Sequence, residues 1–233
     1  MMDKNNVEYT SSLLALLQIV DSGFPTGGFS HSLGYESAVK HGHIRSKKQL
    51  TEFVITVLEN IGSSSLPLLC EAYKQSGDMS KIIALDEYTE ACLSNHIANR
   101  SSVQQGKSLI ASSSETFKDK RMLNIKDNIQ SGKVKGHQPV MYGCVCSFLN
   151  ISLEDALISF LFSSLRTILA SSVRLGDMGP LEAQRIQFEL QACLPNIIER
   201  NKDKTVDDVC LSNPLADIFQ NSHDLLFSRL FYS

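Results

Sequence analysis

Apolar residues recur three and four positions apart along almost the whole chain, and strict alternation over the length of a strand is scarce. The first spacing is typical of amphipathic helices and the second of half-buried strands. Five prolines favour helices too, because each stands where the first turn of a helix is expected and gives up no hydrogen bond there. They are Pro67, Pro139, Pro180, Pro195 and Pro214. The sequence predicts an all-α fold, a multi-helix bundle of roughly ten to twelve helices.

The stretch at 152–174 is predicted to be the central helix. Leu157, Leu161 and Leu165 mark one apolar side, and further apolar residues occupy the others, so we expect neighbours all around it. Arg166 and Arg174 fall within this apolar stretch. A buried arginine needs a carboxylate or carbonyl partner, or must reach a surface. An internal ion pair and a role in an interface both fit.

At 233 residues the chain has the length of one large domain or two small ones. No proline-rich tract, charge block or shift in composition divides it, and 42% hydrophobic with 20% charged residues is typical of a globular protein. We therefore predict a single domain over 1–233. The least structured parts are expected at about 1–8, which we take as a flexible N-terminus, at 130–138 and at 200–213.

Charge and targeting signals narrow the class of partner. The formal net charge is −3 and basic residues form no cluster, which argues against nucleic-acid binding. The apolar run near the N-terminus lacks a basic flank and a small-residue cleavage site, so we do not read it as a signal peptide. Charged residues interrupt the apolar stretch at 151–170, which favours a buried helix over a membrane span. Six cysteines without secretory signals suggest reduced thiols and a cytoplasmic protein. The absence of a basic cluster makes other proteins the expected partners.

Residues 21–36 carry four glycines and a proline between two helical patterns. Phe24 and Phe29 give this stretch apolar groups, which a flexible linker would lack, and we expect both to be at least partly buried. Gly27 and Gly28 can adopt a positive φ or let another backbone approach closely. We predict an ordered loop, in which valine at Gly28 would damage folding or assembly. A tight helix connection and a binding loop both remain open.

Gly106-Lys107-Ser108 invites comparison with a phosphate-binding loop. The Walker pattern needs a glycine at the place of Ser101 and a strand before it, and the sequence has neither. We expect this segment inside a helix, where Gly106 permits close packing.

The spacing of histidines and cysteines does not match that of known metal sites. His41-Gly42-His43 and Cys144-Val145-Cys146 lack the Cys-x-x-Cys spacing and the i, i+4 histidine spacing of structural zinc sites. No tight intrinsic metal site is predicted. His31, His41 and His43 remain candidates for a transient nickel contact, because imidazole suits that ion.

Nucleophilic catalysis has no recognisable pattern either, because the chain lacks a Gly-x-Ser-x-Gly elbow and a family-like Cys, His and acidic arrangement. We predict that the chain is not an enzyme. Two alternatives stay open: a helical hydrolase that uses His31, His137 or His223, and a nickel-storage protein.

Residues 21–36 resemble the signature of the UreF family of urease accessory proteins, Asp-x-x-Phe-Pro-x-Gly-Gly-Phe-x-His-Ser-x-Gly-hydrophobic-Glu. Three further segments fit the family pattern in the correct order. They are 136–143, then 172–179 with Gln184-Arg185, and finally Asn213-Pro214 leading through 222–224 to 229–233. Two positions depart from it: Tyr232 stands where the family often has a basic residue, and Asp177 where it often has a proline.

The resemblance implies an all-helical homodimer that bridges a UreD/UreH-type scaffold and a UreG-type GTPase during nickel delivery to apo-urease. Nickel and GTP would be handled by the partners, so no intrinsic cofactor is expected. Control of GTP hydrolysis has been suggested for the family. An arginine that took part would stabilise transition-state charge in trans, with Arg166, Arg174 and Arg185 as candidates.

The resemblance also implies that the C-terminal tail, about 225–233, docks onto the scaffold. We expect Leu230 to Ser233 to serve the partner rather than the chain's own core, so that deleting them would leave the isolated protein folded. The full set of predicted partner-binding residues is Phe24, Gly27, Gly28, Phe29, His31, Glu36, Arg166, Arg174, Gln184, Arg185, Arg229, Leu230, Phe231 and Tyr232.

Overall fold

The structure is a computed structural model that describes the backbone of residues 4–233 and the side chains of residues 9–233. Within this part of the chain there are twelve α-helices, four short 3-10 helices and no strand, which confirms the all-α prediction. The 3-10 helices are η1 (Gly28–Ser30), η2 (Gln191–Cys193), η3 (Val206–Asp208) and η4 (His223–Leu225). The α-helices are α1 (Lys4–Val20), α2 (Tyr35–Lys40), α3 (Lys47–Ser64), α4 (Leu66–Gln75), α5 (Met79–Cys92), α6 (His96–Phe117), α7 (Lys120–Gln130), α8 (Gln138–Phe148), α9 (Leu153–Leu175), α10 (Pro180–Leu190), α11 (Leu194–Asn201) and α12 (Pro214–Asn221).

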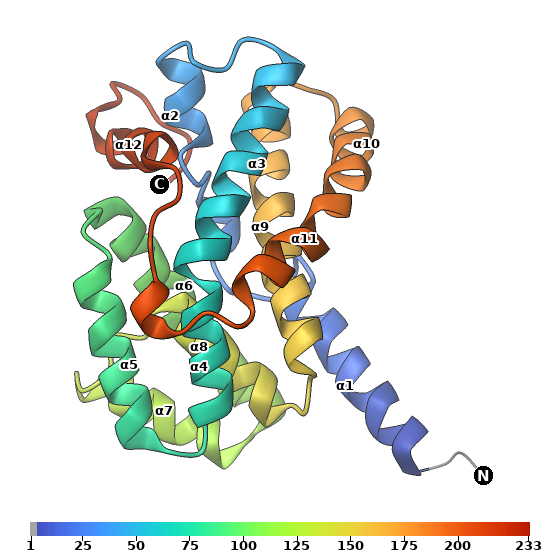
Figure 1. The fold of residues 1–233 in the computed structure, drawn as a ribbon, viewed down its shortest axis with the longest axis vertical. Helices are drawn as coiled ribbons and strands as arrows, with labels where there is room; N and C mark the ends of the chain where they lie inside the picture. The colour runs from blue at the N-terminus through green and yellow to red at the C-terminus, as the bar shows by residue number, and fades with distance from the viewer. Residues whose placement is uncertain (1–3) are drawn as a thin grey trace.

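Helices α3 and α9 pack side by side along the middle of the molecule, with α10 and α11 on one flank (Figure 1). Helices α4 to α8 form one end, coloured from teal through green to yellow, and α2 and α12 pack together at the opposite end. Helix α1 extends away from this body. The two chain ends described in the structure therefore lie far apart in Figure 1.

Local capping chemistry starts several helices where the sequence predicts. The Ser46 hydroxyl accepts a hydrogen bond from the Gln49 N–H at the start of α3, and Ser152 accepts one from the Asp155 N–H at the start of α9. Such caps satisfy N–H groups that have no partner inside the helix. Prolines occupy the first turns of α4, α8, α10, α11 and α12.

The most enclosed helix is α8 rather than α9. Nine of the eleven residues of α8 are buried, against ten of the 23 in α9, where Ile158 and Ala170 are exposed. The expectation that 152–174 has neighbours on all sides is therefore wrong. Helix α8 is enclosed because α4 and α6 both pack against it. A Cβ at Gly143 would lie 2.5 Å from the Leu69 carbonyl oxygen of α4, so only glycine allows this approach.

Two helical stretches, Lys47–Gln75 and Leu153–Leu175, are long and apolar enough to cross a membrane by length and composition alone. In these stretches 67% and 56% of the apolar window is buried inside the protein. Core helices have this combination of length, composition and burial.

Two of the three parts expected to be least structured are held in place. The buried carboxylate of Asp86 accepts hydrogen bonds from the N–H groups of Lys135, Gly136 and His137, at 2.5, 3.0 and 2.8 Å, which fixes the connection at 130–138. The segment at 200–213 is tied to α3, where Asn60 Oδ1 accepts from the Asn213 N–H at 2.6 Å. At the N-terminus α1 begins at Lys4, and residues 1–3 lie outside the described residues.

Candidate functional site

The glycine-rich loop at 21–36 connects α1 to α2 through η1 and is ordered. Gly27 and Gly34 have φ of +78° and +84°, the left-handed region that favours glycine. A Cβ at Gly34 would lie 3.1 Å from the Gln220 backbone nitrogen, so α12 packs directly on this loop. Gly28 has no positive φ, and a Cβ there would meet side chains and no backbone, with the end of Gln105 at 3.2 Å and the Thr26 hydroxyl at 3.7 Å. The reasons predicted for damage by valine at Gly28 therefore apply to Gly27 and Gly34 instead.

Phe24 and Phe29 have different surroundings. Phe24 is buried, as predicted. Its ring stacks on that of Phe117 of α6, with the centroids 6.2 Å apart. Phe29 keeps 67% of its surface exposed, so the expectation of burial is wrong for it. Its ring faces the Arg174 guanidinium carbon at 3.6 Å, a cation–π contact that an exposed aromatic ring can make.

Residues 230–233, which we call the C-terminal segment, return to this loop. The Tyr232 N–H donates to the Ser30 carbonyl at 2.8 Å, and the Ser32 N–H donates to the Ser233 carbonyl at 2.5 Å. Glu36 of α2 completes the contact, because its two carboxylate oxygens accept from the N–H groups of Leu230 and Phe231, at 2.7 and 3.0 Å. The loop and the C-terminal segment thus form one structural unit.

The expectation that Leu230 to Ser233 are independent of the chain's own core is wrong. Phe231 is only 4% exposed and Ser233 is buried, so both belong to the fold. Leu230 and Tyr232 of the same segment are exposed. Of the residues predicted to bind partners, Phe24, His31, Glu36 and Phe231 are buried and hold the unit together.

His31 lies inside this unit, with Nδ1 2.7 Å from the Ser233 hydroxyl. Burial, with the nearby Arg100 and His223, lowers the pKa of His31 to about 4, so the ring is neutral at pH 7. Among the described residues, His31 Nε2 and His223 Nδ1 have no hydrogen-bond partner. His31 is therefore a neutral core histidine and is not displayed on the surface as a ligand.

His41 and His43 are brought together on a different part of the molecule. Both are exposed, and their rings lie 6.3 and 4.8 Å from the ring of Phe219. In the described part of the chain no group of three or more His, Cys, Asp or Glu side chains is arranged to hold a metal ion. A transient nickel contact at these two histidines stays a prediction.

Arg166 and Arg174 pair with carbonyl oxygens. Arg166 donates to the Val20 carbonyl and Arg174 to the Phe29 carbonyl, and neither has an ion-pair partner among the described residues. Arg174 also lies over the ring of Phe231, 4.4 Å from its centroid, and burial lowers its pKa. The structure therefore shows a carbonyl partner for each arginine and not the internal ion pair that the sequence alone also allows. Arg166 thus fixes the end of α1 to α9, and Arg174 fixes the glycine-rich loop to α9.

A second charged group supports the C-terminal end, and of its members Arg229 was predicted to bind a partner whereas Arg100 and Asp224 were not. Arg100 of α6 makes two hydrogen bonds to the Asp224 carboxylate, at 3.0 and 3.1 Å, and one to the Tyr232 carbonyl at 3.0 Å. Arg229 donates to the same carboxylate. The Arg100 hydrogen bonds lower the pKa of Asp224 to about 2. The family-like segment 222–224 is the sequence signal that could have identified Asp224.

Helix α10 presents an exposed face on the flank of the molecule. Leu181 and Phe188 are each 74% exposed, and Gln184 and Arg185 lie between them at helical spacing. These residues line one shallow groove with Glu189. The structure therefore brings together the predicted partner-binding residues Gln184 and Arg185 and places them beside two exposed apolar side chains.

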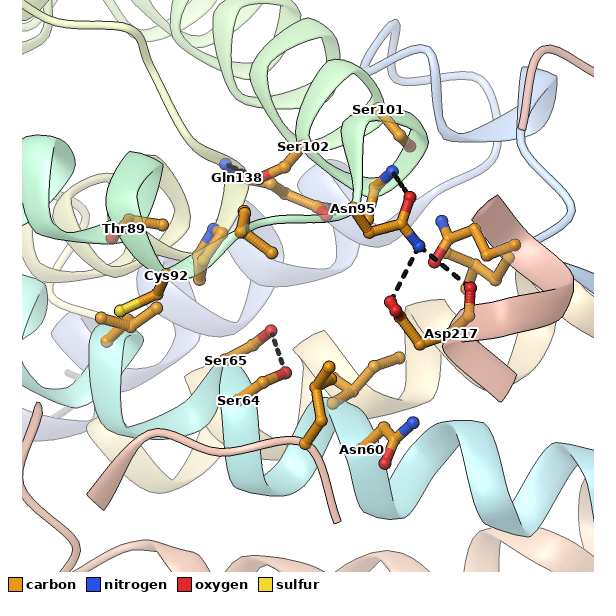
Figure 2. Close-up of a pocket in the computed structure, with 18 of the residues that line it drawn as sticks. Asn60, Ser64, Ser65, Thr89, Cys92, Asn95, Ser101, Ser102, Gln138 and Asp217 are labelled. Atoms are coloured by element: carbon orange, nitrogen blue, oxygen red, sulfur yellow. Dashed lines mark hydrogen bonds between the residues drawn. The ribbon is translucent and has the colours of Figure 1, made fainter. Parts of the chain in front are cut away.

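A cavity of about 400 Å³ lies between α3, α4, α5, α6, α8, α9 and α12 (Figure 2). Leu33 of the glycine-rich loop and Gln220 of α12 belong to its lining, so it borders the unit described above. The sequence did not predict this cavity, because its walls come from helices far apart along the chain.

His137 stands between two polar side chains near this cavity. Its Nε2 is 2.8 Å from Glu90 Oε2 and its Nδ1 is 3.3 Å from the Ser102 hydroxyl. An acid–histidine–serine arrangement of this kind also occurs in the catalytic triads of hydrolases. However, the Gln138 N–H donates to the Ser102 oxygen itself, at 3.1 Å, rather than to a point where an oxyanion would form. The arrangement joins α5, α6 and the start of α8.

Comparison with known proteins gives consistent matches. A family model described as UreF matches residues 44–191. "Urease accessory protein F" of Arabidopsis thaliana is 33% identical, with 93% of this chain and 90% of that protein covered. The protein of that name from Oryza sativa subsp. indica is 32% identical (94% and 85%), and "Urease accessory protein UreF" of Trichodesmium erythraeum is 30% identical (95% and 97%). With the ordered motif at 21–36, these matches show that the chain belongs to the UreF family.

Proposed function

We propose that this protein is a urease accessory protein that binds a UreD/UreH-type scaffold and a UreG-type GTPase during nickel delivery to apo-urease. The names of its relatives support the urease role, and the family resemblance supports these partners. The protein works in the cytoplasm as a homodimer and itself catalyses no reaction. Nickel and GTP are held by the partners.

The observation that carries this proposal is the apolar surface at the C-terminal end. Leu225, Phe227, Leu230 and Tyr232 are all exposed, and Phe227 is completely so. We call these four residues the C-terminal face. They lie in one short stretch of the chain, where exposed apolar groups favour an interaction site, and aromatic residues contribute strongly to protein interfaces. The hydrogen bonds of Glu36 hold the backbone behind Leu230, so this part of the face is ordered before a partner binds.

We assign the scaffold to the C-terminal face and the GTPase to the α10 face, Leu181, Gln184, Arg185 and Phe188. Arg185 is exposed and has no ion-pair partner among the described residues, whereas Arg166 and Arg174 are bound to carbonyl groups. An effect on GTP hydrolysis is therefore assigned to Arg185, whose guanidinium is free to approach a phosphate.

Capture of purified scaffold and GTPase, with and without GTP, tests both assignments. Phe227→Ser is expected to weaken scaffold binding by about tenfold or more and to leave GTPase binding unchanged. Phe188→Ser is expected to do the reverse. Leu123→Ser, at an exposed leucine on α7, is the matched control and should change neither.

Wild-type capture of the scaffold by Phe227→Ser would overturn the assignment of the C-terminal face. Failure of the unmodified protein to bind either partner would overturn the proposed role. Arg185→Gln distinguishes the hydrolytic effect, since it should lower the GTPase rate in the complex more than it lowers binding. Turnover of a substrate by the isolated chain would contradict the statement that it is not an enzyme.

A further inference from the structure

The cavity beside α12 has an unbalanced charge. Among the described residues that line it there is one carboxylate, Asp217, and there is no lysine, arginine or histidine. Asp217 Oδ1 accepts a hydrogen bond from Asn95 Nδ2 at 2.8 Å. Asp217 also lies in the first turn of α12, where the helix dipole favours a negative charge. The lining thus carries one acidic side chain and no basic side chain of the chain beside it.

The remaining walls divide into polar and apolar parts. Figure 2 shows Asn95, Gln138, Ser64 and Ser65 with Asp217 around one common space. The hydroxyls of Ser64 and Ser65 are 3.4 Å apart and either can donate, so each has lone pairs left for another donor. The apolar part includes Ile61, Leu68 and Phe160. This combination fits a ligand with a cationic, hydrogen-bonding head and a small apolar body, and the volume is that of a small-molecule site.

A coordinated metal ion fits the cavity less well. No group of three or more His, Cys, Asp or Glu side chains capable of holding a metal occurs in the described part of the chain, and Asp217 is the one carboxylate in the lining. A primary ammonium needs fewer charged ligands than a metal ion does. It has three donors, which one carboxylate oxygen and two hydroxyl or amide oxygens can accept.

We propose that this cavity binds a small organic cation, a primary ammonium on a short apolar chain. The ammonium donates to Asp217 and to the Ser64 and Ser65 hydroxyls, and the short chain packs on Leu68 and Phe160. Asn95 holds Asp217 in place, because its Nδ2 donates to that carboxylate while its Oδ1 accepts from the Ile97 and Ala98 N–H groups. The rim is open to solvent near Cys92 and Leu211, which are exposed and provide an entrance.

Titration calorimetry on the isolated full chain tests this inference with n-butylammonium, 1-butanol and butyrate as probes. The three share one apolar chain and differ in the head group. The ammonium is expected to bind at least about tenfold more tightly than the alcohol, because it forms charge-assisted hydrogen bonds, and butyrate is not expected to bind. Equal affinity for the ammonium and the alcohol would overturn the assignment of a cation.

Two variants locate the site. Asp217→Asn keeps the oxygen that accepts from Asn95 but removes the charge, so the ammonium should bind about tenfold more weakly while the alcohol is unaffected. Asp127→Asn, at an exposed carboxylate on α7, is the control and should bind as the wild type does. Ala98→Leu adds apolar volume on the wall formed by α6 and should abolish binding of both probes.

Unchanged ammonium affinity in a folded Asp217→Asn variant would show that the cation binds elsewhere. No heat of binding with up to about 10 mM ammonium would overturn the site altogether. Because these measurements use the isolated chain, they are independent of whether the scaffold and the GTPase bind.

Discussion

His31 is a buried imidazole whose titration couples the stability of the fold to pH. Its pKa is about 4 in the folded protein and 6.5 in a model peptide, mainly because of burial. Between these values the unfolded chain binds a proton that the folded chain does not bind. The free energy of unfolding should therefore fall by about 3 kcal/mol as the pH drops from 6.5 to 4.

Urea unfolding at several pH values measures this dependence. His31→Asn should be less stable at pH 7 but should lose less stability between pH 6.5 and 4. Asp224 does not interfere, because its pKa is lowered from 3.8 to about 2 and its contribution is lost only below pH 3.8. Equal pH slopes for the wild type and His31→Asn would contradict the assignment.

Gly106 of α6 lies against the backbone of the segment that leads into α8. Alanine in a helix normally gains about 1 kcal/mol over glycine. Here a Cβ would lie 2.1 Å from the Gly136 carbonyl oxygen and 2.9 Å from the Gln138 nitrogen, and neither backbone group can move alone. We expect Gly106→Ala to lower the free energy of unfolding by about 2–4 kcal/mol, as measured in urea. Gly179→Ala, where nothing lies within 4 Å, should change it little, and a stabilising Gly106→Ala would contradict the packing described.

At the scale of elements, α2 holds the C-terminal segment through Glu36. Glu36→Gln replaces one acceptor oxygen with an NH₂ group that faces a backbone N–H, so one buried donor loses its partner. The expected cost is about 1–3 kcal/mol. Amide exchange at Leu230 and Phe231 should accelerate by about tenfold or more, while exchange in α3 and α8 changes little.

Glu189→Gln, at an exposed glutamate of α10, is the control for this change. It should leave the exchange rates of Leu230 and Phe231 as they are. Uniform acceleration across the whole molecule in Glu36→Gln would show that the C-terminal segment does not open as a separate unit.

At the scale of the whole molecule, α1 is the element that the fold leaves uncovered. It extends from the body, and Leu13, Leu14 and Leu17 on it are exposed at helical spacing (Figure 1). We propose that a second copy covers this side of α1 about a two-fold axis. Light scattering at micromolar concentration is expected to give a dimer for the wild type and a monomer for Leu14→Asp with Leu17→Asp. Leu123→Asp should remain dimeric, and a monomeric wild type would refute the proposal.

The fold class was predictable because helix formation leaves local signals. Apolar spacing, the caps at Ser46 and Ser152 and the prolines in first turns act within a few residues of one another, and all of them agree. The four ordered motifs in turn identified the family, which the comparisons confirm. The same periodicity could not show that α8 rather than α9 is the most enclosed helix, because the enclosure of a helix depends on which other helices pack against it.

Several features were decided only by the tertiary structure, since their partners are far apart in sequence. Glu36 and Phe231 are separated by 195 positions, so no local pattern could show that the C-terminal segment belongs to the fold. The sequence is also compatible with a carboxylate partner for Arg174. In the folded protein Arg174 instead contacts Phe29 of the loop, donating to its carbonyl and lying over its ring. The sequence by itself determined the helices and the family. Packing between distant segments determined which residues are buried, which face outward and where a cavity remains, because burial depends on the whole chain at once.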